Sequence, residues 1–444
     1  FDHRILAGSG NVTLSIATNA GAAGTVVENF GVGSSVTIAG RKAIIDPTSD
    51  LDYGETYHIS YPSGAFTNTG GDVSYVGTAY TFGVKPYVGY LRATGENESG
   101  ELGQNNITKY SSPVQIPGGN WLRTMGDASK GAFGFKSDNT LWAWGYNYYG
   151  ALGINWYQNP GNYGISSPTQ VPGTTWKDVS SLSYSSVAVK TDGTLWALGG
   201  YNASGQLGQN NRTDYSSPVQ IGSGTDWNKV AGFLNGAAAT KTDGTLWMWG
   251  KNGNGELGQN SIQSPSNHGM SSPVQVPGTT WETPNAGGAF ISAFKTDGTL
   301  WVWGKNSEGQ LGLNTTIRYS SPVQLPGSWS TVSIRNGSVS SGVKTDGTLW
   351  AWGWNGAGYL GQNNKTAYSS PVQIPGTTWL NSATTGSHHV ALKTDGTAWA
   401  MGNNNQGQLG QNNLTQYSSP IQIPGTDYTQ VETGSQSVYW IRES

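Results

Sequence analysis

The chain has 444 residues, and its 23 basic and 26 acidic side chains give a formal net charge of −3. Charged residues make up only 11% of the sequence, whereas about 25% is usual for soluble domains. We therefore do not expect a nucleic-acid-binding surface, because neutralising phosphates needs clustered Lys and Arg. The sequence has no cysteine, which excludes disulfides, thiolate catalysis and cysteine-based zinc sites. Its 19 tryptophans exclude an aromatic-poor disordered chain.

The sequence also bears on location. It contains no apolar run of roughly 18 residues, so no membrane insertion is predicted. It begins at Phe1 rather than Met, which favours a chain that is part of a larger protein or assembly. Abundant Asn, Gly, Ser, Thr, Tyr and Trp with few charges favour an exposed surface over the cytosol. We expect an extracellular location, at a virion surface or a bacterial cell surface.

Residues 1–86 differ from the rest and predict a small β domain. Apolar residues alternate with polar ones at Val12, Leu14 and Ile16, and again at Val36 and Ile38, as expected for strands with one buried face. The segment 83–86, Gly-Val-Lys-Pro, is the predicted joint to a second domain over 87–444.

The second domain is an internal repeat, which is typical of solenoids and propellers. A Leu-Gly pair recurs seven times, at intervals of 49 to 55 residues. The pairs stand at 102–103, 152–153, 207–208, 257–258, 311–312, 360–361 and 409–410.

Each repeat predicts four short strands. A Trp opens the first strand, as at Trp176, and the second ends in a Lys-Thr-Asp-Gly-Thr turn, as at 190–194. Asp-Gly between apolar runs is a hairpin signal, because Gly adopts positive φ at little cost. A Leu-Trp-x-Trp-Gly run gives the third strand, and a long polar loop follows it. Pro flanks the fourth strand, as at 111–118, so this strand should be the outer edge. Seven such sheets predict a β-propeller.

The two ends of the repeat array predict how the ring closes. The Asp-Gly hairpin, or a close variant, occurs six times, and the seventh is missing. Residues 428–441 should supply the first two strands of the first blade, and residues 90–95 its third. Sixteen of the tryptophans recur in phase with the repeat and should pack between blades; Trp156, Trp354 and Trp440 are out of phase.

The repeat resembles that of the RCC1 family (regulator of chromosome condensation). The motif stands at 304–312, GKNSEGQLG, with six relatives in the chain. The resemblance covers about 87–444 and implies an all-β fold, a seven-bladed RCC1-like β-propeller closed by C-terminal strands that join the first blade. The eukaryotic founders exchange nucleotide on a small GTPase and bind chromatin, which the neutral loops do not favour here. The near-identical repeats look more similar to bacterial and bacteriophage members.

The head resembles a bacterial Ig-like domain of the S-layer or adhesin type. The matching segments are 46–57 (DPTSDLDYGETY), 63–66 and 80–82. The resemblance implies an N-terminal Ig-like β-sandwich that is incomplete at its N-terminus, because such domains begin one strand before Phe1.

No catalytic constellation is recognised, so we predict no catalytic residue, no metal site and no cofactor. The adjacent His388 and His389 should point to opposite faces of a strand, which makes a poor two-ligand site. Two acidic clusters offer oxygen ligands of the kind that Ca²⁺ takes, although solvated loops are the favoured interpretation. The clusters are Glu96, Glu98 and Glu101 in the first blade and Asp46, Asp50 and Asp52 in the head.

The repeats differ most in the loops between their third and fourth strands. The second and fourth blades carry insertions at 154–165 and 259–270, on the ring face that also carries the turns between first and second strands. Exposed Tyr and Trp supply rigid contact area and are enriched at binding hot spots. We predict a binding face there, with self-packing of the loops as the alternative. Its candidate residues are Tyr146, Tyr148, Tyr149, Trp156, Tyr157, Tyr163, Tyr201, Trp354 and Tyr359.

These observations favour a non-enzymatic, surface-displayed recognition, adhesion or structural module, in first place a phage virion surface or fibre component. A bacterial cell-surface or secreted adhesin is one alternative, and a soluble protein-binding inhibitor similar to the β-lactamase-inhibitor propellers is another. The partner would be a protein or glycan on a cell surface or virion, with no nucleic acid and no membrane insertion. An enzyme on this fold would need convergent carboxylates or histidines that the sequence does not reveal.

Overall fold

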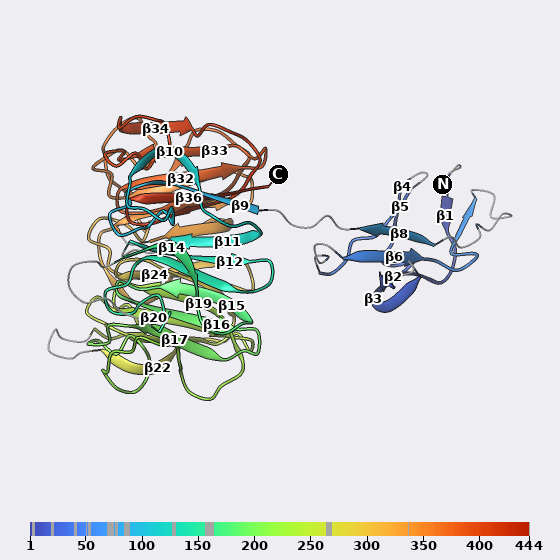
Figure 1. Ribbon diagram of the computed structural model, residues 1–444, viewed down its shortest axis with the longest axis horizontal. Helices are drawn as coiled ribbons and strands as arrows, with labels where there is room; N and C mark the ends of the chain where they lie inside the picture. Colours follow the sequence, from blue (N-terminus) through green and yellow to red (C-terminus); the bar gives the residue numbers. More distant parts are fainter. Residues whose placement is uncertain are drawn as a thin grey trace. The chain divides into compact units, whose positions relative to one another are not determined.

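The computed structural model of the protein describes residues 1, 5–18, 22–39, 42–49, 51, 55–68, 75, 79–83, 89–126, 130–155, 164–262, 269–335 and 337–443. Contacts divide the chain into two compact units, Phe1–Tyr87 and Val88–Ser444, here called unit 1 and unit 2 (Figure 1). Every regular element in the described ranges is a β-strand, which confirms an all-β fold. Within those ranges no helix is long and apolar enough to cross a membrane.

Unit 1 contains a four-stranded antiparallel sheet and two strand pairs. The sheet has the order β3 (Ala23–Gly31), β2 (Asn11–Ala17), β6 (Thr56–Ser60), β8 (Tyr80–Gly83); the pairs are β1 (Ile5–Ala7) with β7 (Phe66–Asn68) and β4 (Thr37–Ala39) with β5 (Lys42–Ile44). Val12 and Leu14 of β2 are buried in one core with Phe30, Tyr57 and Phe66. The predicted alternation therefore does place one face of this strand in the core.

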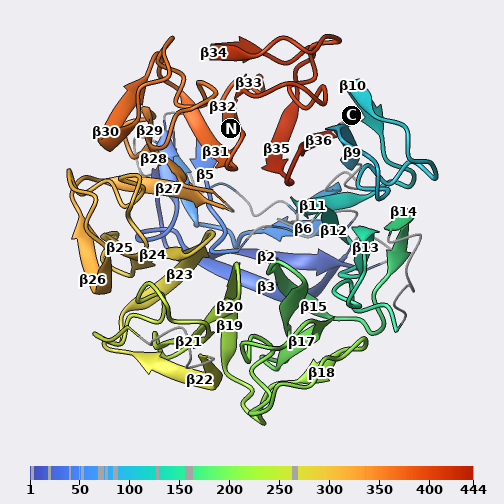
Figure 2. The same ribbon diagram turned by 90° about the vertical axis from the view of Figure 1, so that its left-hand side faces the viewer.

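The described residues of unit 2 form seven four-stranded antiparallel sheets around a common axis (Figure 2). Sheet 1 joins both ends of the unit: β10 (Tyr110–Gln115), β9 (Gly89–Gly95), β36 (Ser437–Glu443), β35 (Tyr428–Thr433). Sheet 2 contains β11 (Trp121–Gly126), β12 (Gly131–Lys136), β13 (Leu141–Tyr146) and β14 (Gly164–Gln170). Sheet 3 contains β15 (Trp176–Ser181), β16 (Ser185–Lys190), β17 (Leu195–Gly200) and β18 (Val219–Gln220).

The remaining four sheets follow the same order along the chain. Sheet 4 contains β19 (Trp227–Phe233), β20 (Gly236–Lys241), β21 (Leu246–Gly250) and β22 (Met270–Val276). Sheet 5 contains β23 (Trp281–Ala286), β24 (Phe290–Lys295), β25 (Leu300–Gly304) and β26 (Tyr319–Leu325). Sheet 6 contains β27 (Trp329–Ile334), β28 (Val339–Lys344), β29 (Leu349–Gly353) and β30 (Tyr368–Ile374). Sheet 7 contains β31 (Trp379–Thr384), β32 (His388–Lys393), β33 (Ala398–Gly402) and β34 (Tyr417–Gln422).

The first strand of each sheet lies nearest the axis, and the fourth lies at the outer edge (Figure 2). The fourth strand pairs only with the third, as β26 pairs with β25. Its Pro, for example Pro322, removes one backbone donor, which an edge strand tolerates because one side of it has no ladder to complete. The predicted outer edge is confirmed.

The Asp-Gly turn between the second and third strands is held by a short chain of side-chain hydrogen bonds. The Thr194 backbone N–H and hydroxyl donate to Asp192 Oδ1, at 3.0 and 2.7 Å, and Trp196 Nε1 donates to Thr194 Oγ1 at 2.7 Å. The Lys190 ammonium lies 4.8 Å from the ring centre of Trp176 and 4.3 Å from that of Trp196, within cation–π range. The same arrangement recurs in sheets 2 and 4 to 7, so the hairpin sequence is structural.

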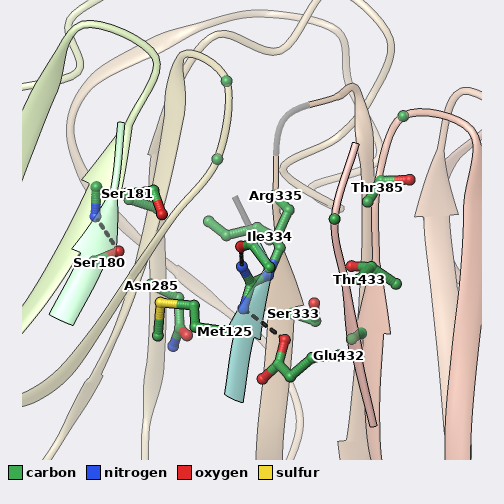
Figure 3. Close-up of a pocket in the computed structure, with 18 of the residues that line it drawn as sticks. Met125, Ser180, Ser181, Asn285, Ser333, Ile334, Arg335, Thr385, Glu432 and Thr433 are labelled. Carbon is green, nitrogen blue, oxygen red and sulfur yellow. Dashed lines mark hydrogen bonds and ion pairs between the residues drawn. The ribbon is translucent and has the colours of Figure 1, made fainter. Parts of the chain in front are cut away.

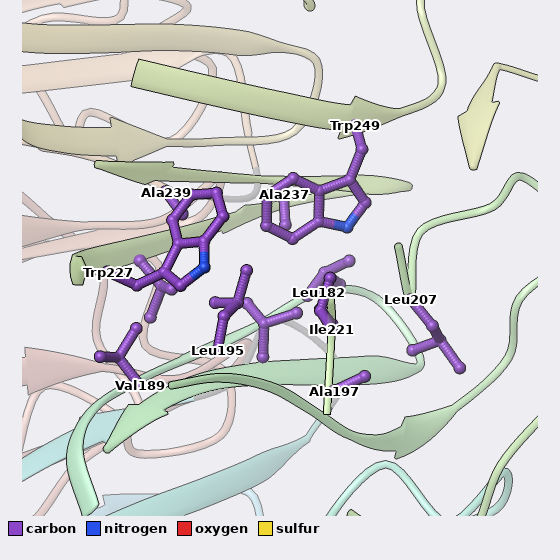
Figure 4. Packing of buried hydrophobic residues seen from close by; sticks show 12 residues of the cluster. Leu182, Val189, Leu195, Ala197, Leu207, Ile221, Trp227, Ala237, Ala239 and Trp249 are labelled. Atoms are coloured by element: carbon purple, nitrogen blue, oxygen red, sulfur yellow. The ribbon is translucent and has the colours of Figure 1, made fainter. Parts of the chain in front are cut away.

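The third strand joins each sheet to the one before it. In sheet 4 the fully buried Trp249 packs on Leu195, Leu207 and Ile221 of sheet 3 (Figure 4). Its Nε1 donates to the Gln206 carbonyl of sheet 3 at 2.9 Å. Burying an indole contributes on the order of several kcal/mol, and its hydrogen bond keeps the ring nitrogen satisfied. The prediction that in-phase tryptophans pack between sheets is confirmed for this set.

The long loop between the third and fourth strands is organised by one buried Asn. In sheet 5, Asn306 Oδ1 accepts from the Leu311 backbone N–H at 2.9 Å, and its Nδ2 donates to the carbonyls of Thr315 and Ile317 at 2.8 and 2.9 Å. The amide thereby satisfies backbone groups at both ends of the loop. The corresponding residues in all seven sheets are buried Asn: Asn97, Asn147, Asn202, Asn252, Asn306, Asn355 and Asn404.

The C-terminal strands close the ring, as the sequence predicts. β36 pairs with β9 in an unbroken antiparallel register from Ser437 opposite Gly95 to Glu443 opposite Gly89. Trp440 of β36 is fully buried and packs against sheet 7. The out-of-phase Trp440 is therefore a core residue of the closing sheet.

Two buried histidines connect sheet 7 to both of its neighbours. His388 Nε2 lies 3.2 Å from the Ser437 carbonyl of sheet 1, and His389 Nδ1 lies 3.2 Å from the Tyr359 carbonyl of sheet 6. A carbonyl only accepts, so each ring nitrogen carries a proton and each ring is a neutral donor. Burial lowers the pKa of both imidazoles to about 4. They do point to opposite sides of the strand, and they are structural.

Deleting residues 428–444 should abolish cooperative folding of unit 2, because β9 then loses β36, one of its two partner strands, and sheet 7 loses the surface that covers it. All 19 tryptophans lie in unit 2, so intrinsic tryptophan fluorescence during thermal melting reports on this unit alone. We expect no sharp transition. The control Leu414→Ala, 61% exposed in a loop, should melt within a few degrees of the unaltered chain, and an unchanged melt of the shortened chain would contradict closure by these strands.

The buried histidines should make unit 2 less stable in mild acid. Their pKa in the folded protein lies below the unfolded value, so stability is full above pH 6.5 and falls as the pH approaches 4. The loss between pH 7 and pH 5 should be on the order of 2 kcal/mol for each histidine. Denaturant unfolding at both pH values measures it. His389→Gln should reduce the difference between the free energies of unfolding at pH 7 and pH 5 by about that amount. If the variant shows the same difference as the unaltered chain, His389 is not a cause of the pH dependence.

Candidate functional site

One face of the ring carries the loops that hold both insertions. Because strands alternate in direction, the turn between first and second strands and the loop between third and fourth strands meet at the same end of each sheet. In sheet 2, Gly131 pairs with Gly145 and Tyr146 with Gly164, which places both connections together. We call this end of unit 2 the loop face. Residues 156–163 and 263–268 of the two insertions, with Trp156, Tyr157 and Tyr163, lie outside the described residues.

A cluster of five tyrosines spans sheets 2 and 3 on the loop face. Tyr149 is at its centre, with ring-centre distances of 4.5 Å to Tyr148, 5.1 Å to Tyr201 and 5.6 Å to Tyr184. Tyr146 lies 6.2 Å from Tyr184. Tyr184, which lies in the turn before β16, is 44% exposed, and the other four are half-buried. The structure thus brings four predicted binding residues together and adds Tyr184, while the rings also pack on one another.

The two predicted residues of sheet 6 differ from each other. Trp354 is 44% exposed on the loop face, whereas Tyr359 is only 1% exposed and belongs to a core cluster. Burial raises the pKa of Tyr359 to about 12. Tyr359 fills the position between the Gly and Leu of the Gly-x-Leu-Gly element, where the other side chains are also turned inward. It packs against Trp354 at 5.7 Å and supports that residue from below.

Trp354 and two of the tyrosines occupy one equivalent position, directly before the invariant buried Asn. Across sheets 1 to 7 this position holds Glu96, Tyr146, Tyr201, Lys251, Lys305, Trp354 and Asn403. The backbone at this position is fixed, since the Lys305 N–H donates to the Ala289 carbonyl at 2.9 Å and the Trp354 N–H donates to the Ser338 carbonyl at 2.9 Å. Acidic, basic, aromatic and amide side chains are thus presented on one repeated frame.

A cavity of about 490 Å³ lies on the ring axis and is lined by the ends of the first strands. Arg335, after β27, reaches across it (Figure 3). Its guanidinium donates to Glu432 Oε2 of sheet 1 at 2.6 Å and to the Gly126 carbonyl of sheet 2 at 2.7 Å. Burial raises the pKa of Glu432, while the nearby Arg335 opposes that rise. The pair crosses the axis and ties three sheets together.

Nearly half of the remaining lining residues are neutral and polar, and the others are glycines or apolar residues. Ser180, Ser181, Asn285, Ser333 and Thr385 contribute hydroxyl and amide groups (Figure 3). Such groups can donate to and accept from a polar ligand, whereas the two charged side chains are already paired with each other. Sequence analysis missed Arg335 and Glu432, because each stands in a turn or strand whose other copies carry unrelated residues.

The acidic cluster of sheet 1 is an ion-pair network. Lys130 Nζ lies 2.8 Å from Glu96 Oε1, and Lys109 Nζ lies 2.9 Å from Glu98 Oε1. Within the described part of the chain, no group of three or more His, Cys, Asp or Glu side chains is placed to hold a metal ion. Asp50 and Asp52 of the head cluster lie outside the described residues.

Glu101 of this cluster stands apart because it is almost fully buried. Its Oε2 accepts from the Ser99 backbone N–H at 2.8 Å, and burial, together with the charge of Glu96, raises its pKa to about 7. The equivalent residues Gln206 and Gln408 accept the same backbone hydrogen bond, at 2.8 and 2.9 Å, without a charge. The loop therefore needs only an uncharged hydrogen-bond acceptor at this position, not a carboxylate.

Glu101→Gln should stabilise unit 2 at alkaline pH. The folded pKa of Glu101 lies above the unfolded value of 4.5, so stability is full below pH 4.5 and is lost as the pH rises through about 7. Removing the charge should therefore gain about 2–3 kcal/mol at pH 8 and little at pH 5. Denaturant unfolding at both pH values tests this, and a gain that is the same at pH 5 and pH 8 would show that the charge is not its cause.

Comparison with known proteins gives the fold its context. A model of the RCC1-like domain matches residues 90–439. The ultraviolet-B receptor UVR8 of Arabidopsis thaliana is 25% identical over 239 residues, which are 52% of this chain and 52% of the receptor. The mitochondrial RCC1 domain-containing protein RUG3 of the same plant is 29% identical over 258 residues, 50% of this chain and 55% of that protein. The chain thus spans about half the length of these curated relatives.

Solved structures agree on the fold. Prp20p of Saccharomyces cerevisiae, the yeast RCC1, has a TM-score of 0.71 at 18% identity, with 81% of this chain and 92% of that chain covered. Human WBSCR16 has a TM-score of 0.69 at 18% identity, with 80% of this chain and 100% of that chain covered. Identities this low show a shared fold and nothing about shared activity.

These relatives correct the predicted location. We expected an extracellular protein at a virion or bacterial cell surface, and that expectation is wrong. One relative is a mitochondrial protein, and the yeast RCC1 neighbour was solved bound to Kap60 and was studied for its binding to histones. A low content of charged residues is therefore not a mark of an external surface here, because the same composition follows from the repeat, which uses Gly, Ser, Asn and Trp to build its turns and core. The suggested bacterial or phage source stays a prediction.

The family match and the geometry concern the same part of the molecule. The matched residues begin in β9 and end in β36, the two strands whose pairing closes the ring. The predicted RCC1-repeat β-propeller is confirmed, and the chain belongs to the RCC1-like domain family.

Proposed function

We propose that this protein is a non-enzymatic protein-binding module whose loop face contacts its partner. In this proposal the seven sheets of unit 2 are the blades of a complete seven-bladed propeller, and unit 1 is an Ig-like β-sandwich that forms a separate module. The observation that carries the proposal is the variable residue directly before each invariant buried Asn.

A constant frame with variable side chains suits recognition. The seven buried Asn hold the loops in one shape, so the residue before each of them starts from the same backbone position. Packing of the ring does not require that residue to change from acidic to aromatic to basic. An asymmetric partner does require it, because a ring with seven equal blades would offer every partner seven equal orientations.

The tyrosine cluster supplies the anchor of this surface. Tyr and Trp dominate binding hot spots because they bury a large area with little loss of side-chain entropy. Tyr184 and Trp354 are both 44% exposed, and each is backed by a further aromatic ring, Tyr149 and Tyr359. Rings that are supported in this way are ordered before a partner arrives, which reduces the entropy lost on binding.

A protein partner is favoured over nucleic acid. The loop face carries both signs of charge, and the net charge of the chain is −3, whereas phosphate recognition needs a concentrated positive surface. Relatives supply further support, since the yeast RCC1 propeller was solved in complex with the protein Kap60. Aromatic faces also stack on sugar rings, so a glycan partner is a possible outcome of the test.

Replacing the centre of the tyrosine cluster should weaken partner binding. The double variant Tyr148→Ala, Tyr149→Ala removes two supporting rings and should reduce affinity at least about tenfold, equivalent to about 1.4 kcal/mol. The melting temperature of unit 2 should fall by only a few degrees. Proteins captured from the native source by the unaltered chain and by the variant are compared by quantitative mass spectrometry, and glycan binding is read on an array.

A matched control separates a specific surface from general stickiness. Tyr80 belongs to unit 1, is 58% exposed and is not part of the tyrosine cluster, so Tyr80→Ala should capture the same proteins as the unaltered chain. Equal capture by the double variant would remove the tyrosine cluster from the proposal. Equal losses of captured protein in both variants would show that exposed aromatic residues bind proteins regardless of their position in the chain.

A further inference from the structure

A second feature of the loop face, a basic hollow between sheets 4 and 5, has a chemistry of its own. It has a volume of about 280 Å³ and is lined by Lys251, which follows β21, and by Lys305, which follows β25. Both lysines occupy the variable position before an invariant Asn. Their backbones are fixed, since the Lys251 N–H donates to the Asn235 carbonyl at 2.9 Å and the Lys305 N–H donates to the Ala289 carbonyl at 2.9 Å. Two cationic side chains are thereby directed at one hollow.

The positive charge of this hollow is only partly offset. Across the described residues no ion pair forms at Lys251 or Lys305, whereas Lys109 and Lys130 of the same face each pair with a glutamate. The one carboxylate that lines the hollow, Glu256, is 2% exposed. It is occupied with Asn254, whose backbone N–H donates to it at 2.7 Å and whose side-chain amide donates at 3.0 Å. Two lysines against one inward-turned carboxylate leave one uncompensated positive charge.

The wall of the hollow adds an apolar surface. Leu234 is 38% exposed there, and its backbone N–H donates to the Gly288 carbonyl of sheet 5 at 3.0 Å. Gly288 and Ala289 also line the hollow, and their small side chains occupy little of it. Ala289 is equivalent to Tyr184 of sheet 3, because the carbonyl of each accepts from the N–H of the variable residue, Lys305 or Tyr201. Where sheet 3 fills this space with a ring, sheet 5 leaves it open.

We propose that this hollow binds an acidic segment of a protein partner, with a carboxylate between Lys251 and Lys305 and a neighbouring apolar side chain on Leu234. The inference rests on the proposed function and specifies the chemistry of the partner. A carboxylate fits because it neutralises the excess charge, and the compact ammonium group of lysine can donate to it from several directions. An adjacent apolar residue fits because Leu234 otherwise remains exposed beside the charge. The tyrosine cluster on sheets 2 and 3 would contact a separate part of the same partner.

The test uses a short fluorescein-labelled peptide of alternating Glu and Leu, with a Gln and Leu peptide as the neutral match, and fluorescence polarisation on the full chain. We expect the acidic peptide to bind at least about tenfold more tightly than the neutral one, with a difference that shrinks as salt is raised. Lys251→Ala, Lys305→Ala should remove that preference. Lys365→Ala, which removes an exposed lysine from a sheet 6 loop, should leave it unchanged.

A second variant tests the hollow without changing charge. Ala289→Tyr introduces the residue that sheet 3 carries at the equivalent position. It should weaken binding of the acidic peptide about as much as removing the two lysines does, although both lysines remain. If Ala289→Tyr leaves binding of the acidic peptide unchanged, the proposed site is wrong. If Lys365→Ala weakens that binding as much as Lys251→Ala, Lys305→Ala does, the peptide is attracted by surface lysines in general and the site is also wrong. Tighter binding of a single-stranded oligothymidylate to the same lysines would overturn the acidic-peptide assignment.

The outcome for this hollow and the outcome for the proposed function can be told apart. If the acidic peptide does not bind but the Tyr148→Ala, Tyr149→Ala variant still loses captured proteins, the assignment of the hollow to an acidic segment is wrong and the proposed protein-binding function is supported. If the peptide binds as expected but no protein depends on the tyrosine cluster, the acidic-segment site stands and the aromatic anchor is wrong.

Discussion

The ring of unit 2 depends on one contact, the buried side chain that each third strand places against the preceding sheet, which is an indole in four of the seven sheets. A single four-stranded sheet cannot bury both of its faces, so each sheet is stable only when its neighbour covers it. Trp144, Trp249, Trp303 and Trp352 are fully buried in this role, and each Nε1 donates to a backbone carbonyl of the sheet before it, at 2.7 to 2.9 Å. The acceptor belongs to the Gly-x-Leu-Gly element, so the same contact that fills the core also fixes the long loop of the neighbouring sheet.

The sheets that lack this indole show what the contact requires. Sheet 1 has Thr94 at the equivalent position, and its hydroxyl donates to the Gln408 carbonyl of sheet 7 at 3.1 Å. Trp440, from the adjacent closing strand, is fully buried against sheet 7 and fills the volume that Thr94 leaves. Leu198 and Met401 take the position in sheets 3 and 7 and are also fully buried. A fully buried side chain thus occupies this position in all seven sheets, while the indole and its hydrogen bond are present in four of them.

This separation of roles explains why side chains of different chemistry gather at one end of the sheets. Tryptophans, buried Asn and Asp-Gly turns specify the core, the loop shapes and the opposite face, and they repeat because each performs the same task in each sheet. The residues that lie outside those tasks are free to differ, and on the loop face they place tyrosines over sheets 2 and 3, lysines over sheets 4 and 5 and an ion-pair network over sheet 1. A surface with three separate chemistries can orient a partner as well as hold it.

The sequence by itself determined the repeat, the number and order of strands in each copy, the outer edge and the closure by the C-terminal strands. These follow from local signals, such as Asp-Gly at a hairpin or Pro at an edge, whose meaning does not depend on distant residues. It also placed Tyr146, Tyr148, Tyr149 and Tyr201 on the variable face, because their position in the repeat fixes the end of the sheet on which they lie.

Only the tertiary structure decided which of the candidate aromatics are exposed and which charges are paired. Tyr359 and Trp354 are five residues apart, yet one is core and the other surface, because the Gly-x-Leu-Gly element turns its central side chain inward. Arg335 and Glu432 are 97 residues apart in the sequence and meet across the axis, and Lys251 and Lys305 line one hollow although they belong to different sheets. Repeat phase predicts the strand and the face for each residue, but distances between residues of different sheets arise only when the ring closes.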